Sequence, residues 1–222
     1  MATIGLIGSG RIGSTVARLA VNAGHQVVVS NSRGPSTLTD LVAELGLAAR
    51  AGTLERAAAA GDIVVVTIPV KANQAVPAAP LDGKVVIDTG NYYPLRDGLV
   101  PELDAGELTD SQYLLRHIPG ARVVKAFNNI FFPHLLNLAR PAGASDRTYL
   151  PIAGDDAAAK ETVSSFLDSI GYSTVDAGTL AESWRQQPHT PVYGAPYGQR
   201  ADEKGLPASE ALIRSALSWA TR

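Results

Sequence analysis

The chain has 222 residues, of which 19 are basic and 21 are acidic, so its formal net charge is −2. That length fits one domain of good size, and the nearly balanced charge argues against a nucleic acid or an anionic membrane as partner. Cysteine is absent, which excludes disulfides, zinc–thiolate sites and thiol nucleophiles, and we expect no metal site.

The first apolar run, Thr3-Ile4-Gly5-Leu6-Ile7, reads as a strand rather than as a signal peptide, because glycines and Arg11 interrupt it at once. No other segment holds the roughly 18 consecutive apolar residues that a membrane span requires. We therefore expect a soluble, cytoplasmic protein.

Apolar runs of strand length alternate with helical patterns along the first half of the chain. Strands are predicted at 4–7, 26–30, near 48–51, 62–68 and 84–88, with helices at 14–23, 37–45 and 53–60. Gly24 ends the first helix, and Thr37-Leu38-Thr39-Asp40 has the spacing of a capping box. The continuous apolar run Asp62–Ile68 is typical of a central parallel strand.

The second half continues the alternation, with strands at 122–127, 149–153 and 172–175 and helices at 155–170, from about 180, and at 209–220. This order predicts an α/β fold, a Rossmann-type doubly wound and mainly parallel sheet with a short C-terminal helical segment. No linker divides the chain, so residues 1–222 are predicted to form one NAD(P)-binding domain. Residues 184–222 would be a C-terminal lid or helical appendage, in which Pro188–Gly198 reads as an ordered loop or lid.

A glycine-rich turn follows the first strand. Its six residues stand between a strand and a helix, which is the context that makes GxGxxG informative: Gly8, Ser9, Gly10, Arg11, Ile12 and Gly13. Gly8 permits the tight turn, Gly10 lets a pyrophosphate approach the backbone, and Gly13 lets the helix pack closely on the strand. Free amide groups at the helix start would then face the phosphates. The turn predicts a dinucleotide site.

The end of the second strand indicates which dinucleotide binds. An NAD site has a carboxylate about 20 residues after the turn, yet no Asp or Glu occurs between Ser14 and Thr39. The position carries Ser30-Asn31-Ser32-Arg33 instead. A carboxylate would repel a 2′-phosphate, whereas Asn31, Ser32 and Arg33 offer donors and a guanidinium that would hold it. The predicted cofactor is NADP(H) rather than NAD.

Three further strands end in small or polar residues that we expect at the same edge of the sheet. The segments are Thr67-Ile68-Pro69-Val70, Thr89-Gly90-Asn91 and Phe127-Asn128-Asn129, and Ala126 before the last of them is also expected to adjoin the cofactor. Pro69 and Val70 would pack against the adenosine or the nicotinamide ribose. Asn91 and Asn128 are the polar groups expected nearest the reacting ring. Lys125, within the last of these strands, is expected to bury its stem and keep its ammonium group at the surface, the alternative being that it points into the cleft.

Taken together, GSGRIG, NSR, TIP, IDTGN and VVKAFNNI resemble the NADP-dependent reductases of the deazaflavin coenzyme F-420. Gly154-Asp155 and Asp176–Leu180 are similar to the closing pattern of that family. The series also resembles the cytosolic oxidoreductase domain of the six-transmembrane metalloreductases. The resemblance covers about residues 3–184 and implies a hydride transfer between NADPH and a deazaflavin or flavin.

The resemblance also implies which residues adjoin the reacting rings. The family has a histidine near the nicotinamide where this chain has Asn128, and Ile130 matches a position that lines the deazaflavin ring. Asn128 and Ile130 are therefore the candidate catalytic positions. The tail from Trp184 onward departs from the family, and this leaves the acceptor open. The family and the short chain suggest a homodimer.

Other dehydrogenase classes fit less well. None of the seven tyrosines has a lysine four residues on, which excludes the short-chain dehydrogenases. The β-hydroxyacid dehydrogenases and imine reductases add a long helical domain, for which too few residues follow the last strand. His117 and His134 have no carboxylate partner in the sequence pattern, so no acid–base pair is evident.

The lack of a proton relay favours a flavin-like acceptor, since hydride transfer between stacked rings needs mainly positioning. Trp184, Tyr193 and Tyr197 could form an aromatic lid over such a ring, or pack the C-terminal segment against the sheet or a second copy. The leading hypothesis is an NADP-dependent oxidoreductase that acts on coenzyme F-420 or a flavin. The alternatives are an NADPH-dependent reductase of a small carbonyl, imine or alkene compound, and an NADP-sensing regulator without chemistry.

Overall fold

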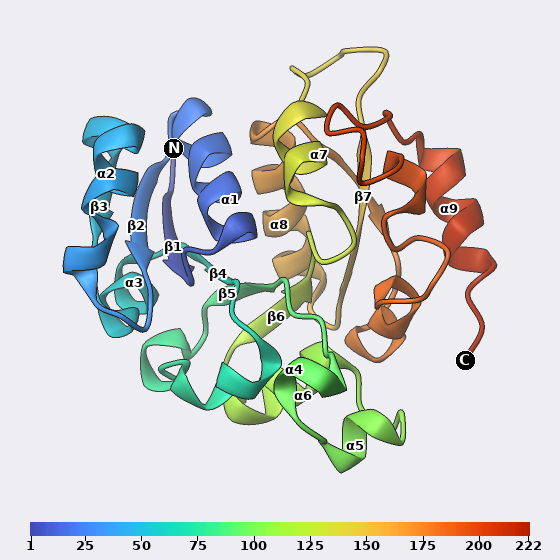
Figure 1. Cartoon of the computed structure of the whole chain (residues 1–222), viewed down its shortest axis with the longest axis horizontal. Helices are drawn as coiled ribbons and strands as arrows, with labels where there is room; N and C mark the ends of the chain where they lie inside the picture. Colours follow the sequence, from blue (N-terminus) through green and yellow to red (C-terminus); the bar gives the residue numbers. More distant parts are fainter.

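An eight-stranded sheet runs through the computed structural model, which describes all of residues 1–222, in the order β3-β2-β1-β4-β5-β6-β7-β8 (Figure 1). The strands are β1 Thr3–Ile7, β2 Gln26–Ser30, β3 Ala49–Ala51, β4 Ile63–Val66, β5 Val85–Asp88, β6 Arg122–Lys125, β7 Tyr149–Gly154 and β8 Ser173–Asp176. All neighbours pair in parallel except β6 and β7, which are antiparallel. The predicted fold class, a mainly parallel Rossmann-type sheet, is confirmed.

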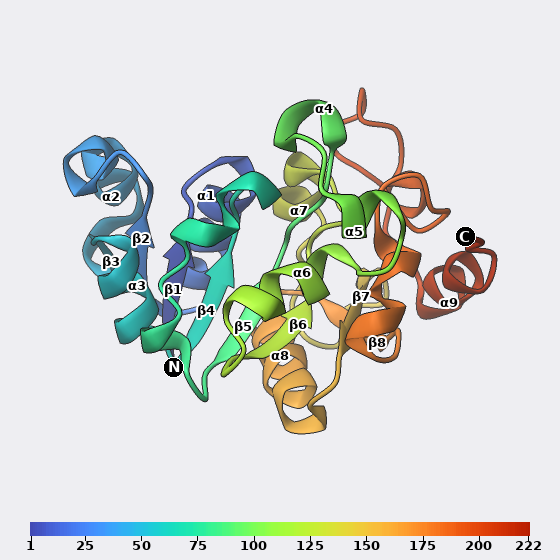
Figure 2. The ribbon, with the colours of Figure 1, turned by 90° about the horizontal axis from the view of Figure 1, so that it is seen from below.

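Nine α-helices flank the strands: α1 Arg11–Asn22, α2 Thr39–Leu45, α3 Leu54–Ala60, α4 Pro94–Asp97, α5 Pro101–Asp104, α6 Asp110–His117, α7 Phe132–Asn137, α8 Ala157–Ser169 and α9 Glu210–Ser218. Short 3₁₀ helices are η1 Pro35–Leu38, η2 Gly46–Ala48, η3 Val70–Ala75, η4 Ala79–Leu81, η5 Leu180–Gln186 and η6 Ala195–Tyr197. Figures 1 and 2 both show α2 and α3 at one end of the sheet and α9 at the other.

Both faces of the central sheet are covered, as its sequence predicts. All four residues of β4 are buried, and they divide by alternation between two apolar clusters. Ile63 and Val65 belong to the larger cluster, which contains side chains of α1 and α8, whereas Val64 and Val66 belong to a smaller one with side chains of α6. The continuous apolar run therefore reflects burial from two sides.

The C-terminal residues are part of the main core. Tyr197, Ile213 and Leu217 are buried in the larger cluster, and α9 packs on β7 and β8. Of the three aromatic residues considered for a lid, Tyr197 is therefore a core residue, with no exposed surface.

The predicted strands lie where the sequence placed them, with ends that differ by up to two residues. The capping box at Thr37 is wrong: α2 begins two residues later without a side-chain cap, because the Thr37 hydroxyl bonds to Asn31 and to the Gly34 carbonyl. The helix from about Leu180 is the 3₁₀ helix η5. Helices α4 to α7 were not predicted.

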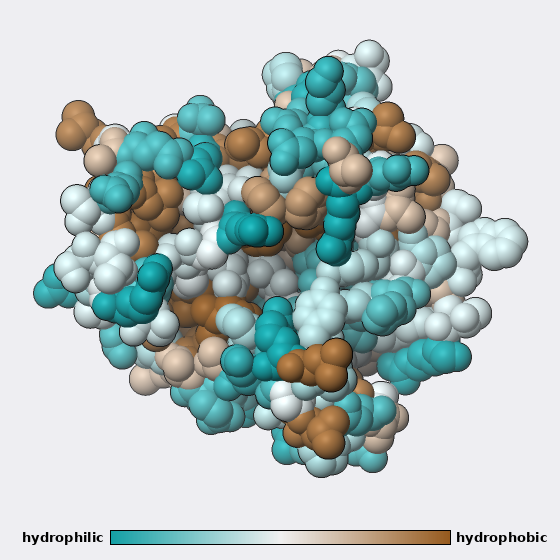
Figure 3. Space-filling model, in the orientation of Figure 1, coloured by the Kyte–Doolittle hydropathy of each residue, from teal (hydrophilic) through white to brown (hydrophobic).

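Apolar side chains on the face shown in Figure 3 appear in several separate places among hydrophilic and neutral residues. The fully exposed leucines, Leu47 and Leu95, lie far apart in the chain on α2–β3 and α4 respectively. No helix combines the length and the apolar character that crossing a membrane would need.

Candidate nucleotide and acceptor site

The predicted site segments meet because five parallel strands end at one edge. Ile7 stands opposite both Ser30 and Val66, and Asp88 stands opposite both Val66 and Lys125. The segments after β1, β2, β4, β5 and β6 therefore leave the sheet in register. Strands β1 to β3 extend the sheet to one side and β4 to β6 to the other, so the strand order reverses between β1 and β4, and the crevice at such a point is where open α/β sheets bind ligands.

The glycine-rich turn is held by Thr67 at the end of β4. The Thr67 hydroxyl donates to the Gly8 carbonyl over 2.8 Å. Gly8 has a φ of 110°, and a Cβ there would come within 2.6 Å of the Thr67 carbonyl oxygen. A Cβ on Gly13 would collide with the Gly8 carbonyl oxygen, so the close packing predicted for this glycine is present.

The space above the turn is open beside Gly10. A Cβ on Gly10 would meet nothing within 4 Å, so the missing side chain leaves open room rather than relieving a contact. Helix α1 starts at Arg11 with no side-chain cap and no acidic residue in its first turn. Its first amide groups thus have no partner in the helix and point where an anion would bind.

At the end of β2, Asn31 joins the two loops that would border the adenosine. Its amide group donates to Ser9 Oγ over 3.3 Å and to Thr37 Oγ1 over 2.9 Å, and its carbonyl oxygen accepts from the Arg33 amide over 2.9 Å. The Arg33 and Ser32 side chains are exposed, and Arg33 forms no ion pair. The Arg33 guanidinium is thus not neutralised by an acidic side chain, and its role toward a 2′-phosphate stays a prediction. Thr37 was missed, because its hydroxyl was assigned to a helix cap.

The segments after β4 and β5 border the same edge. Ile68 and Pro69 are partly exposed, whereas Val70 is buried at the start of η3. The Thr89 hydroxyl donates to the Val66 carbonyl over 3.1 Å, and the Gly90 amide donates to Asp88 Oδ1 over 2.8 Å. The first of these bonds joins the ends of the two strands, and the second closes the turn that follows β5.

Lys125 departs from the sequence prediction. Its ammonium group has no exposed surface and lies 3.7 Å from Asp88 Oδ2 and 3.9 Å from Asp110 Oδ2, so the expected surface position is wrong. It donates to the Gly90 carbonyl over 2.8 Å and to Ser111 Oγ over 3.2 Å. The ammonium group is enclosed by Asp88 of β5, by Asp110 and Ser111 of α6 and by the turn at Gly90, which the sequence pattern around Lys125 does not indicate. Through the bond from Lys125 to the Gly90 carbonyl, this cluster stabilises the Thr89–Asn91 turn.

Asp110 is a buried carboxylate of this cluster. Burial raises its pKa above the ordinary value, against the opposing effects of the Lys125 charge and of the hydrogen bond from the Tyr92 amide.

A cavity of about 390 Å³ lies directly against these turns. One wall comes from the glycine-rich turn and the strand ends, with Arg11, Ile12, Thr89, Asn91 and residues 127–130. The facing residues come from α7 and from the C-terminal segment, and include Phe131, Phe132, Tyr193 and Arg200. The cavity thus adjoins both candidate catalytic positions, Asn128 and Ile130.

Asn128 connects the wall to the C-terminal segment. Its side-chain amide donates to Asn91 Oδ1 over 3.0 Å and to the Gln186 carbonyl over 2.6 Å, while Asn91 donates to the Asn128 carbonyl over 2.8 Å. The neighbouring Asn129 donates to the Val192 carbonyl and to the Tyr197 hydroxyl. The side-chain oxygens of both asparagines are buried without a partner. The residue before them, Phe127, has a φ of 62°, a strained conformation of the kind found at functional sites.

Two tyrosines close one side of the cavity. The hydroxyl groups of Tyr93 and Tyr193 share a hydrogen bond of 2.5 Å. Burial, and then this hydrogen bond, raise the pKa of Tyr93 well above its ordinary value. His134, also in the wall, is buried, and its Nε2 bonds to the Asp202 carbonyl while its Nδ1 has no partner. No carboxylate lines this cavity.

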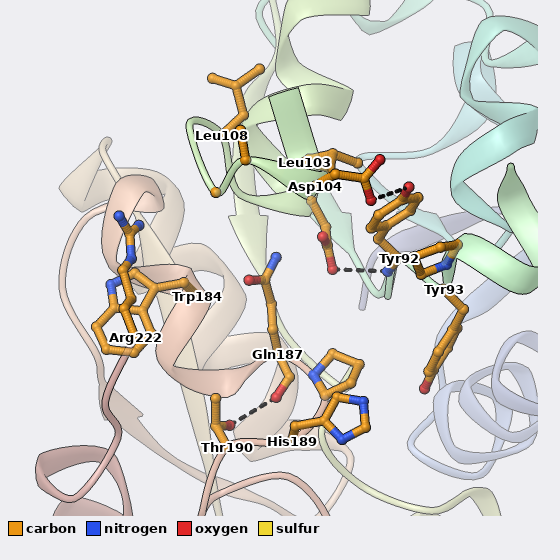
Figure 4. Close-up of a pocket in the computed structure, with 15 residues that line it drawn as sticks. Tyr92, Tyr93, Leu103, Asp104, Leu108, Trp184, Gln187, His189, Thr190 and Arg222 are labelled. Carbon is orange, nitrogen blue, oxygen red and sulfur yellow. Dashed lines mark hydrogen bonds between the residues drawn. The ribbon is translucent and has the colours of Figure 1, made fainter. Parts of the chain in front are cut away.

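A second, wider cavity of about 640 Å³ lies on the other side of Tyr93, which lines both (Figure 4). Tyr92 donates from its hydroxyl to Asp104 and from its amide to Asp110, and Gln187 stands in the middle of the view. Arg222 lies over the ring of Trp184, 5.1 Å from its centroid. Of the aromatic residues considered for a lid, Trp184 thus borders this second cavity and Tyr193 the first.

The turn, the strand ends and the cavity can be compared with known proteins. Residues 3–92 match the family model of coenzyme F-420-dependent NADP oxidoreductases. This match covers the turn, Arg33, the β4 end and the β5 end, so the resemblance predicted from the sequence is confirmed.

Solved structures similar to this chain extend the match to most of its length. The hypothetical protein SMa0349 from Sinorhizobium meliloti is 27% identical, with a TM-score of 0.77 over 94% of this chain and 97% of that one. A protein from Arthrobacter sp. FB24, provisionally assigned as an F-420-dependent NADP reductase, is 25% identical, with a TM-score of 0.69 over 83% and 88%.

Among curated proteins, the metalloreductase STEAP3 of Rattus norvegicus is 29% identical over 183 residues, or 81% of this chain. The chain spans 34% of the length of that relative. The reductase family and its structural neighbours support the prediction of an NADP-dependent oxidoreductase.

Tyr93, Phe131 and Phe132 line the cavity but were not predicted from the sequence. Tyr93 follows IDTGN almost directly, and Phe131 and Phe132 follow VVKAFNNI, so extending each strand-end segment would have included them. Arg96 and Arg200 had no comparable signal, because they come from a short helix and from an irregular segment.

Proposed function

We propose that the protein transfers a hydride between NADPH and a flavin-like acceptor, either coenzyme F-420 or a flavin. The observation that carries this proposal is the cavity beside the cofactor turns, which has aromatic and amide walls and no carboxylate. Its volume of about 390 Å³ is in the range of sites for small planar ligands.

The residues described above would bind the nucleotide. Arg33, Asn31 and Ser32 would bind the 2′-phosphate, the amides of residues 10–13 the pyrophosphate, and Thr89 and Asn91 the nicotinamide side. When bound, NADPH supplies the hydride. The chain itself orients the ring and excludes water, with Asn128 fixing the position of Asn91 through two reciprocal hydrogen bonds.

The residues that line the cavity include no suitable proton donor, which supports an acceptor whose reduction needs no acid from the protein. Reduction of a carbonyl or imine usually requires a positioned general acid. The Tyr93 hydroxyl has a raised pKa and is already bonded to Tyr193, so it is a poor proton donor. A flavin or deazaflavin ring accepts the hydride into its conjugated system and takes up the accompanying proton from solvent, so the protein needs no acid for this step.

Anaerobic stopped-flow absorbance tests the proposal. NADPH is mixed with the protein and with F-420, FMN, or a panel of small carbonyl and imine compounds. Loss of NADPH absorbance with F-420 or FMN is expected. Turnover only with a carbonyl or imine would favour the alternative reductase, and binding of NADPH without turnover of any acceptor would favour the NADP-sensing regulator.

A further inference from the structure

The cavity that borders the strand ends has an unusual charge. Its lining residues include Arg11, Arg96 and Arg200 but no Asp or Glu, although acidic residues outnumber basic ones in the whole chain. An opening with charges of one sign attracts ligands of the other sign. The charge of this cavity therefore carries information about what enters it.

The three guanidinium groups differ in how far they are neutralised. Arg96 pairs with the Asp97 carboxylate at 2.8 Å and also donates to the Asn91 carbonyl. Arg11 and Arg200 form neither an ion pair nor a side-chain hydrogen bond. Each lies instead against an aromatic ring of the wall: Arg11 is 5.1 Å from the centroid of Phe132, and Arg200 is 5.6 Å from that of Phe131. The cavity thus has two uncompensated cations.

These two cations stand at different parts of the wall. Arg11 is the first residue of α1, beside the open space above Gly10, so the cofactor pyrophosphate is its natural partner. Arg200 follows η6 in the C-terminal segment and contacts the ring of Phe131. The centroids of the Phe131 and Phe132 rings are 4.8 Å apart. The cofactor turns offer no anion for it.

We propose that Arg200 binds an anionic group, a phosphate or a carboxylate, on the side chain of the planar acceptor. A guanidinium that lies against an aromatic ring keeps the N–H donors in its own plane free, and these match the geometry of either oxyanion. The substrate class is therefore an anionic flavin or deazaflavin rather than a neutral one. This inference rests on the proposed function.

The test compares acceptors that share a ring and differ in charge. FMN carries a phosphate, 10-(carboxymethyl)flavin carries a carboxylate, and riboflavin carries neither. Binding to the protein saturated with NADP⁺ is followed by quenching of flavin fluorescence, and turnover by loss of NADPH absorbance. We expect at least one anionic flavin to bind about tenfold more tightly than riboflavin, the order expected for a charged hydrogen bond. The preferred arm identifies phosphate or carboxylate.

Variants assign this preference to one residue. Arg200→Gln should remove it, by weakening the anionic flavin about tenfold and leaving riboflavin unchanged, and Arg200→Lys should restore part of it. Arg214→Gln, on α9 and paired with Glu210, is the control for losing an exposed arginine and should change neither. Equal binding of all three flavins, or equal weakening of all three by Arg200→Gln, would overturn the inference.

The readouts separate this inference from the proposed function. Reduction of all three flavins with equal efficiency would support the proposed function and refute the role of Arg200 as an anion site. Selective binding of an anionic flavin without any hydride transfer would support the role of Arg200 as an anion site and sink the proposed function.

Discussion

Replacing Lys125 by methionine tests whether the buried charge cluster stabilises the cofactor turns. The side chains of Lys125, Asp88 and Asp110 are at most 5% exposed, so the change would leave two close carboxylates in the interior without a cation. Removing one partner of a buried ion pair typically costs about 3 to 5 kcal/mol. The Gly90 carbonyl and Ser111 hydroxyl also lose their bond to the ammonium group. We expect Lys125→Met to lower the free energy of unfolding by about 3 to 5 kcal/mol at neutral pH.

The loss should depend on pH in a defined direction. Burial raises the pKa of Asp110, so between its pKa in the unfolded chain and its higher pKa in the folded protein the folded state binds more protons. The contribution of this group to stability is therefore largest at acidic pH and decreases as pH rises through that window. Without Lys125 the pKa of Asp110 rises further, and the deficit of Lys125→Met should shrink as the solution is acidified.

Urea unfolding at neutral and at mildly acidic pH measures these effects. Lys160→Met, which breaks the exposed pair with Asp176, is the matched control and should cost no more than about 1 kcal/mol. Asp110→Asn in the Lys125→Met background removes one of the two unpaired charges and should recover at least about 1 kcal/mol. A loss no larger than that of the control, or a double variant less stable than Lys125→Met, would refute the reasoning.

Three further predictions concern the cofactor and the cavity. Arg33→Ala should weaken NADPH binding by about 1 to 3 kcal/mol and leave NADH binding unchanged, as measured by titration; equal losses would end the 2′-phosphate argument. Gly10→Ala should abolish NADPH binding and change the free energy of unfolding by less than about 1 kcal/mol. Gly13→Ala should lower the free energy of unfolding by about 1 to 3 kcal/mol through the clash with Gly8. NADPH binding by Gly10→Ala would contradict the assignment of the open space to the pyrophosphate. Tyr93→Phe should reduce kcat far less than the roughly 100-fold that loss of a general acid costs, and a larger fall in steady-state rates would restore the carbonyl or imine alternative.

The sheet could be predicted because its strands are continuous apolar runs. β4 and β5 are buried on every residue, and a run of that kind between glycine- or polar-rich ends has few other structures open to it. The nucleotide half of the site followed from the same pattern, since strand ends in register determine where Gly8, Asn31 and Asn91 must lie. These are local signals joined by one topological rule.

Three of the four helices between β5 and β7 could not be predicted for the opposite reason. α4, α5 and α7 have four to six residues each and begin with or near a proline, so they show no amphipathic period. The interior position of the Lys125 ammonium group depends on Asp110 and Ser111 in α6, which reach it only through the tertiary fold. No pattern around VVKAF indicates them.

The acceptor is the part of the function that the sequence left most open, and the structure gives a physical reason. The cavity wall facing the cofactor turns is formed by Phe131 and Phe132 together with the segment around Tyr193 and Arg200. That segment has no regular structure beyond η6 and is fixed by the amide groups of Asn128 and Asn129, which donate to Gln186, Val192 and Tyr197. If the proposed function holds, specificity for the acceptor would be carried by this irregular segment rather than by the regular strand ends. We expect related chains with the same turn and strand ends to differ in acceptor by changing this segment alone, because two of these three bonds run to backbone carbonyls and only the one to the Tyr197 hydroxyl depends on a particular side chain.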